Sequence, residues 1–206
     1  LFTGLISKSK KSFFNSAVLV NSRGEVQEKY DKNILVPFGE YLPFSYLIPK
    51  FRFLEGKIDF AKGKKNKPIF IDDNYEFLPL ICYEIIFSNL IRKSINSRTS
   101  LLLNITNDAW FGNSIGPSQH FQFAKIRAVE FGIPVVRVAN TGFSGFITPF
   151  GEVINKIELN KKGISTLNLI KRLESTLFKK YGNKILIFLI IIIFTTNILF
   201  SYLINR

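Results

Sequence analysis

The amino-acid sequence predicts a mixed α/β layered domain followed by one C-terminal transmembrane helix. Three observations carry this prediction: segments typical of strands outnumber those typical of helices, two of the strands are long and mainly apolar, and residues 185–205 contain no charge. Helices between some of the strands indicate layers of helix and sheet, and strands apolar on both faces indicate a covered sheet. The length of 206 residues suits one domain with a large core.

The first strand pair is predicted at residues 13–20 and 25–30. The four residues between them end in Gly24 and have the composition of a tight turn in which glycine takes a positive φ. Residues 37–49 contain three prolines and are expected to form a loop.

The other elements follow from apolar periodicity and from the turn residues that separate them. The segments at 101–107 and 134–140 are the two continuous apolar strands, and 118–131 is an amphipathic helix. Further strands are expected at 69–73, 76–84, 153–158 and 164–169, a strand followed by a Pro-Phe-Gly turn at 142–153, and a further helix at 85–96.

The uncharged run at residues 185–205 is long enough to cross a membrane. About 20 apolar residues at a rise of 1.5 Å each cover a hydrocarbon core of about 30 Å. A buried core helix is the alternative, but six consecutive apolar residues at 189–194 favour the membrane. We therefore divide the chain into a soluble domain at 1–169, a basic juxtamembrane segment at 170–184 and a transmembrane helix at 185–205.

Composition excludes several classes of protein. With 28 Lys and Arg against 15 Asp and Glu the net charge is +13, but no nucleic-acid-binding motif accompanies it, so we expect a solvated or anionic-lipid-facing surface and no nucleic-acid partner. One Cys and one His exclude an internal disulfide and a Cys/His zinc site, and we expect no metal and no cofactor. The sequence has no Met, which indicates a fragment of a longer chain; a chain trimmed by signal-peptide removal is the alternative.

Cys82 is the first candidate for chemistry, because it ends an apolar strand and precedes a predicted helix. Backbone N–H groups at such a junction can activate a thiol and can also bind an oxyanion. A small buried apolar cysteine is the alternative. Lys32 leads into an apolar Pro/Gly loop, where it is either functional or an ordinary surface residue, and nothing in the spacing supports His120 as a base for Cys82.

Four segments together resemble the carbon–nitrogen hydrolase, or nitrilase, superfamily. They are YDKNILVPFGEYLPF at 30–44, PLICYE at 79–84, NITNDAWFG followed by GPSQHFQFAKIRAVE within 104–130, and PVVRVANTGFSGFITPFGEV at 134–153. The LVPFGEYLP, NDAWFG and GPSQH strings resemble its membrane branch, the apolipoprotein N-acyltransferases, more than the soluble amidases. The resemblance covers about residues 2–155, and the C-terminal span fits the last transmembrane helix of that branch.

The resemblance implies an α-β-β-α sandwich, incomplete here at its N-terminus, with a Glu-Lys-Cys catalytic triad. Carried over by motif, Cys82 is the nucleophile and Lys32 the triad lysine, which binds the oxyanion together with the Tyr83 backbone N–H. Glu40 matches a further acidic residue that supports acid/base chemistry. The triad glutamate belongs to a Pro-Glu segment that the family places upstream of Leu1, so we expect residues 1–206 alone to be inactive.

Further residues are expected to contact the substrate or the reacting groups: Tyr83, Glu84, Phe38, Tyr41 and Trp110. An apolar lid of Phe38, Tyr41 and Phe44 is a hypothesis. Trp110, with Asn107 and Asp108, either shapes a turn beside the site or binds substrate, and His120 is expected to fix its own helix by hydrogen bonding. For Arg137 and Asn140 the sequence does not separate pocket lining from loop capping.

The implied function is acyl transfer from a phospholipid to the N-terminal diacylglyceryl-cysteine amine of a prolipoprotein, through a Cys thioester. The partners are then a phospholipid donor, the lipoprotein acceptor and the bacterial inner membrane. Lys179, Lys180 and Lys184 precede the span, so local charge would place the domain in the cytoplasm, whereas the family places it in the periplasm; we follow the family. A soluble-type nitrilase or amidase acting on a small amide, and a non-catalytic membrane-anchored module, are the alternatives.

Overall fold

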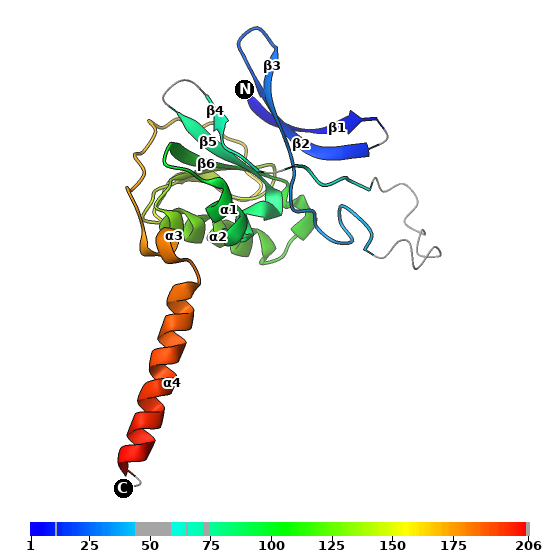
Figure 1. Cartoon of the computed structure of the whole chain (residues 1–206). Coiled ribbons are helices and arrows are strands. Elements are labelled where there is room, and N and C mark those ends of the chain that lie inside the picture. The colour runs from blue at the N-terminus through cyan, green and yellow to red at the C-terminus, as the bar shows by residue number, and fades with distance from the viewer. Residues whose placement is uncertain (11, 44–58, 65, 72–74, 205–206) are drawn as a thin grey trace.

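The computed structural model of the chain describes residues 1–10, 12–43, 59–64, 66–71 and 75–204. They form two sheets, a layer of helices and a long helix that extends away from them, coloured orange to red in Figure 1. Apolar side chains of the first sheet (Ala17, Tyr30) and of the second (Phe77, Leu101) share one buried cluster. The layers therefore run from helices through the larger sheet to the smaller sheet, as the predicted sandwich requires.

The smaller sheet is antiparallel, with strand order β1-β2-β3, and comprises β1 (Phe2–Ser9), β2 (Ser12–Val20) and β3 (Val26–Asp31). The predicted hairpin is confirmed as β2 and β3, and Gly24 in its turn has φ +83°. The sequence analysis missed β1. Its segment is rich in Ser, Lys and Gly, and it is ordered by pairing along its whole length with β2, from Phe2↔Leu19 to Ser9↔Ser12.

The larger sheet has six strands in sequence order: β4 (Ile69–Phe70), β5 (Glu76–Ile81), β6 (Thr99–Thr106), β7 (Val135–Ala139), β8 (Ser144–Ile147) and β9 (Val153–Ile157). The central strands β5, β6 and β7 are parallel, and the other pairings are antiparallel. The carboxyl ends of β5, β6 and β7 therefore meet at one edge of the sheet, where ligands commonly bind in α/β folds.

One face of the larger sheet is covered by α2 (Gly116–Phe131) and by α1 (Ser88–Ser94). A proline in its first turn favours the start of α2, and Gly132, in the left-handed region with φ +62°, ends it. The predicted helix at 85–96 is wrong at both ends. Residues Cys82–Ile86 form the 3₁₀ turn η2 instead, because Phe87 has a non-helical backbone and breaks the helix.

The expected strand at 164–169 is also wrong. Residues 161–173 form neither helix nor strand. Ile164 is 97% exposed, and Leu167 and Leu169 are exposed as well, so the apolar residues of this segment do not pack on a sheet. The chain that follows is fastened to the domain instead: Arg172 donates to the carbonyls of Asn96, Ser97 and Thr99, and Leu173 N–H donates to Gly132 O.

The C-terminus consists of α3 (Leu177–Tyr181) and α4 (Lys184–Ile204). An 18-residue stretch of α4 has a mean hydropathy of 2.5, and no residue of α4 is buried in the domain, so by length and composition α4 could cross a membrane. At 1.5 Å per residue α4 is about 31 Å long, close to the thickness of a hydrocarbon core. Thr195, Thr196 and Asn197 donate to carbonyls of the preceding turn, which pairs these donors within the helix.

Candidate functional site

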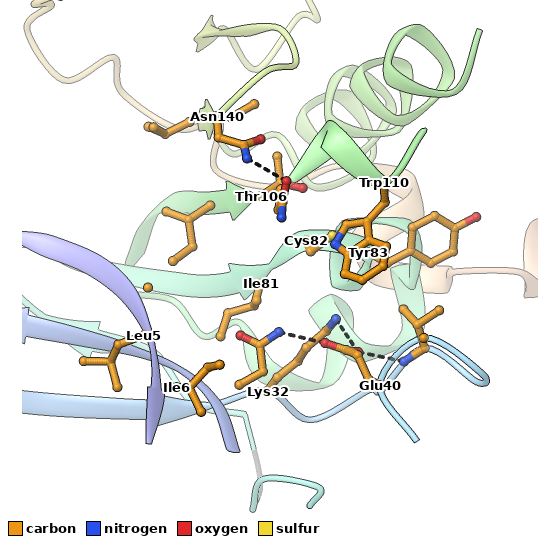
Figure 2. A pocket seen from close by; sticks show the side chains of 18 of the residues that line it. Leu5, Ile6, Lys32, Glu40, Ile81, Cys82, Tyr83, Thr106, Trp110 and Asn140 are labelled. Carbon is orange, nitrogen blue, oxygen red and sulfur yellow. Dashed lines mark hydrogen bonds and ion pairs between the residues drawn. The ribbon is translucent and has the colours of Figure 1, made fainter. Parts of the chain in front are cut away.

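A cavity of about 1060 Å³ opens at the carboxyl ends of β5, β6 and β7, facing β1. Figure 2 shows Lys32 and Glu40 on one side of Cys82, and Thr106 and Asn140 on the other. The wall is mainly apolar. Its apolar residues are Phe2, Gly4, Leu5, Ile6, Val36, Gly39, Phe60, Ile81, Tyr83, Ile105, Trp110, Phe111, Val138 and Ala139. A cavity of this size and lining suits a largely hydrophobic ligand.

Cys82 stands where β5 passes into η2, and it is one of the lining residues. Its φ is +52°, in the left-handed region that costs about 1–2 kcal/mol for a residue with a Cβ. A residue held in this conformation at the edge of a cavity is typical of functional sites. The sharp turn places the partly exposed thiol at the cavity rather than in the core.

Lys32 follows β3, and its side chain is only 1% exposed. Its ammonium donates to Glu40 Oε2 at 2.7 Å. Glu40 is itself held by two more donors, Asn15 Nδ2 to Oε1 at 2.7 Å and Val36 N–H to Oε2 at 2.8 Å. Because both partners are paired, the positive charge of Lys32 is kept in the cavity wall within an otherwise apolar setting.

Glu84 does not line the cavity, although the sequence analysis placed it among residues that contact substrate or reacting groups. Its carboxylate is completely buried and accepts hydrogen bonds from Tyr30 Oη and from the backbone N–H groups of Asn33, Ile34 and Ile81. These donors come from the Lys32 loop and from the end of β5. Burial raises the pKa of Glu84, and the four hydrogen bonds oppose that shift.

The aromatic residues separate into two groups. Tyr83 and Trp110 line the cavity, and Trp110 is 71% exposed at its rim (Figure 2). Phe38 and Tyr41 are exposed and are not among the lining residues; Phe38 has φ +62°. Val36 and Gly39 line the cavity from that loop instead, and Phe44 of the hypothetical lid lies outside the described residues.

Sequence analysis missed a buried polar network beneath Cys82, formed by Asn104, Asp108, His120 and Arg137. Each is at most 2% exposed. Arg137 Nη2 donates to Asp108 Oδ2 at 2.7 Å, and His120 Nδ1 lies 2.9 Å from Asp108 Oδ1. As expected, His120 fixes its helix by hydrogen bonding: its partner is Asp108 of η3 (Asp108–Phe111), so the bond attaches α2 to that turn. The sequence feature that could have indicated this network was a polar residue inside each of the two mainly apolar strands: Asn104 within 101–107 and Arg137 within 134–140.

Burial and the charges of this network shift the pKa values of His120, Arg137 and Asp108. Burial lowers the pKa of His120, and the charge of Arg137 lowers it further, against the opposing effect of Asp108. Burial also lowers the pKa of Arg137, which Asp108 opposes. Burial acts to raise the pKa of Asp108, but His120 and Arg137 outweigh it, and the pKa lies below its usual value. The network therefore holds a neutral imidazole beside a buried ion pair at neutral pH.

Comparison with known proteins gives a family and a fold. The model of the carbon–nitrogen hydrolase family matches residues 1–176. An apolipoprotein N-acyltransferase of Rickettsia bellii is 39% identical over 205 residues, covering 97% of this chain and 41% of the relative. One of Wigglesworthia glossinidia brevipalpis is 40% identical over 202 residues, covering 94% of this chain and 40% of the relative. The chain thus spans about two fifths of the length of each of these two relatives.

Solved structures show the same fold. A carbon–nitrogen hydrolase of Helicobacter pylori has a TM-score of 0.59 at 16% identity, over 76% of this chain and 57% of that one. An amidase mutant of Nesterenkonia has a TM-score of 0.57 at 20% identity, over 77% of this chain and 57% of that one. The second structure is described as carrying an acetamide moiety covalently added at its active-site cysteine.

Proposed function

The chain belongs to the carbon–nitrogen hydrolase family, and on that premise we propose that it is the acyl-transferring part of an apolipoprotein N-acyltransferase. Its relatives at 35–40% identity that bear this name support the proposal. The observation that carries it is the joint placement of Cys82 and Lys32 in one mainly apolar cavity, in a chain with a helix long enough to cross a membrane.

In the proposed first step, the Cys82 thiol gives its proton to a carboxylate base, and the sulfur attacks the ester carbonyl of a phospholipid. The family pattern assigns this base to a glutamate upstream of Leu1. The S–C bond forms and the carbonyl oxygen becomes an oxyanion. Lys32 and the Tyr83 N–H stabilise that charge, and one such donor is typically worth about 3–4 kcal/mol. The ester C–O bond then breaks, and the departing lysophospholipid oxygen takes the proton from the base.

In the second step the α-amine of a diacylglyceryl-cysteine attacks the thioester. The C–N bond forms, the C–S bond breaks, and the amine proton passes through the base to the sulfur. A thioester is reactive enough toward an amine to make this step feasible, and the two steps give ping-pong kinetics. Glu40 contributes by holding Lys32 in the wall, through the 2.7 Å contact between Nζ and Oε2.

We also propose the place of this chemistry. Residues 1–169 would form the catalytic domain, 170–184 a basic segment at the lipid surface, and 185–205 the span in a bacterial inner membrane, with the domain in the periplasm. Protease treatment of spheroplasts tests the orientation: digestion of the domain without lysis is expected, and protection until lysis would place it in the cytoplasm.

An amidase acting on a small amide is the second candidate, favoured by the likeness to amidase structures. The test uses the full-length protein in detergent, with a phospholipid labelled in its acyl chain. We expect a hydroxylamine-sensitive label on Cys82, none in Cys82→Ala, and at most a weak, hydroxylamine-resistant ester in Cys82→Ser. Labelling by small amides with none by phospholipid would favour the amidase.

A further inference from the structure

Asn104 occupies a fixed place between the nucleophile and a buried arginine. The parallel register sets Leu80 of β5 beside Asn104 of β6, and Asn104 beside Arg137 of β7. The Asn104 Nδ2 donates to the carbonyl of Leu80 at 3.0 Å and to that of Cys82 at 3.2 Å, while Oδ1 accepts from Arg137 Nη1. Both ends of the amide are therefore occupied, and its orientation is set.

Arg137 is held in turn by an anchored carboxylate. Asp108 Oδ2 accepts from Arg137 Nη2 at 2.7 Å, and Oδ1 accepts from Thr106 Oγ1 at 3.1 Å and lies 2.9 Å from His120 Nδ1. Gly142 packs so closely that a Cβ there would lie 2.0 Å from Asp108 Oδ2. Well-packed apolar side chains in place of a buried ion pair are often equally stable or more stable, so stability alone does not account for this arrangement.

The hydrogen bond from Asn104 fixes the orientation of the peptide group that joins Cys82 to Tyr83. In a trans peptide the C=O and the N–H point in opposite directions. The Cys82 carbonyl is bound on the Asn104 side, beneath the cavity, so the Tyr83 N–H points the other way, toward the cavity that Cys82 and Tyr83 line. The same hydrogen bond from Asn104 to the Cys82 carbonyl restrains Cys82 at its positive φ.

We propose that Asn104, supported by Arg137, Asp108 and His120, is a positioning residue that aims the Tyr83 N–H at the oxyanion formed on the Cys82 acyl adduct. This inference rests on the proposed function, because it requires Cys82 to be the nucleophile. Asn104 itself does not touch the substrate. Its effect is confined to steps in which an oxyanion forms.

The test compares two reactions of Cys82 in the full-length protein in detergent. Thioester formation from a labelled phospholipid passes through an oxyanion, whereas alkylation by iodoacetamide does not. Asn104→Asp keeps an acceptor for Arg137 but loses both donated hydrogen bonds. We expect it to lower the rate of thioester formation by about 10²–10³-fold, the range for loss of one oxyanion donor, with little change in KM for the lipid. Alkylation of the Cys82 peptide, followed by mass spectrometry, should stay within about twofold of wild type.

Two further variants separate a loss of positioning from a general loss of structure. Gly142→Ala displaces Asp108 without touching Asn104 or Cys82, and it should slow thioester formation while sparing alkylation. Arg127→Lys is the matched control, because Arg127 is also buried but binds the Ile86 carbonyl and Glu130 instead, and both reactions should be unchanged.

Two results would overturn the proposal: Asn104→Asp and Gly142→Ala acylated as fast as wild type, or acylation and alkylation falling together in both variants. Failure of the proposed function has a different signature. Wild-type protein would then be acylated by a small amide and not by phospholipid, and the same comparison of variants would be made with that amide, whose reaction also passes through an oxyanion.

Discussion

The Lys32 ammonium lies 2.7 Å from Glu40 Oε2, with the lysine side chain 1% and the glutamate side chain 12% exposed. This pair joins the end of β3 to the loop that follows it. Asn15 on β2 and the Val36 N–H also donate hydrogen bonds to the Glu40 carboxylate. The charge facing the cavity is therefore set by a pair in which neither partner can be lost alone without leaving an uncompensated buried charge.

Single and double substitutions of that pair should be strongly non-additive. Lys32→Met and Glu40→Gln each remove one charge, and each should lower the free energy of unfolding by about 3–5 kcal/mol, the usual cost of breaking a buried pair from one side. The double variant should lose less than the sum of the two, by about 1–3 kcal/mol, because no charge is then left unpaired. Denaturant unfolding of the four proteins measures the cycle, and additivity within about 0.5 kcal/mol would contradict it.

Glu84→Gln should destabilise the fold although it removes a buried charge. The carboxylate accepts from three backbone N–H groups and from Tyr30, through both oxygens. A carboxamide has one oxygen, so its NH₂ group must face an N–H donor. We expect a loss of about 2–4 kcal/mol, measured by thermal unfolding. Glu152→Gln on the surface is the control, and an equal melting temperature for Glu84→Gln and wild type would count against this account.

The lone histidine should give the stability a distinct pH dependence. The pKa of His120 is lowered in the folded state, so below about pH 6.5 the unfolded chain binds a proton that the folded chain does not. Stability contributed by the neutral imidazole is therefore full above pH 6.5 and falls as the pH drops toward the folded pKa, by at most about 1.4 kcal/mol per pH unit. Glu84, with its raised pKa, acts in the opposite direction at acid pH.

His120→Gln isolates this effect, because the chain has no other histidine. The difference in unfolding free energy between wild type and His120→Gln should shrink as the pH falls from 7 to 5. A difference that stays constant over this range would show that His120 titrates alike in the folded and unfolded chains.

A charge in the middle of α4 should oppose insertion into a membrane. Phe194 lies near the centre of the helix and Leu203 near its end. Phe194→Arg should cost about 2.5–3.5 kcal/mol on insertion, whereas Leu203→Arg should cost far less because it lies near the lipid–water interface. Alkaline extraction of membranes measures the fraction inserted, and equal insertion of both variants would be inconsistent with a span.

Sequence patterns located two central strands and a candidate nucleophile that lines the cavity, for identifiable reasons. The strands around residues 101–107 and 134–140 are mainly apolar, which is typical of strands buried on both faces of a sheet. Cys82 was selected because it ends an apolar strand before a predicted helix and because the PLICYE motif around it resembles that of the family. The ends of the helices and strands were predicted less well. The 3₁₀ turn that begins at Cys82 depends on the positive φ of Cys82 and on the hydrogen bonds of Glu84, and the sequence pattern shows neither.

The buried polar network of Asn104, Asp108, His120 and Arg137 could not be predicted from the sequence for a different reason. Asn104 and Arg137 are 33 residues apart and meet only through the parallel register of β6 and β7. His120 reaches Asp108 from α2, so its partner is set by packing and not by spacing. Glu84 was expected beside the reacting groups because it matches a family position just after the nucleophile, but its side chain is buried, is bound by Tyr30 and backbone N–H groups, and is not among the lining residues.

Lys32 follows a strand of the smaller sheet and Cys82 ends a strand of the larger one, so neither sheet alone contains both residues. If Cys82 is the nucleophile that we propose, it gains the lysine that stabilises its oxyanion only when the two sheets pack together. A chain whose sheets have not packed would carry Cys82 without Lys32, and it would not take an acyl group before the domain is assembled.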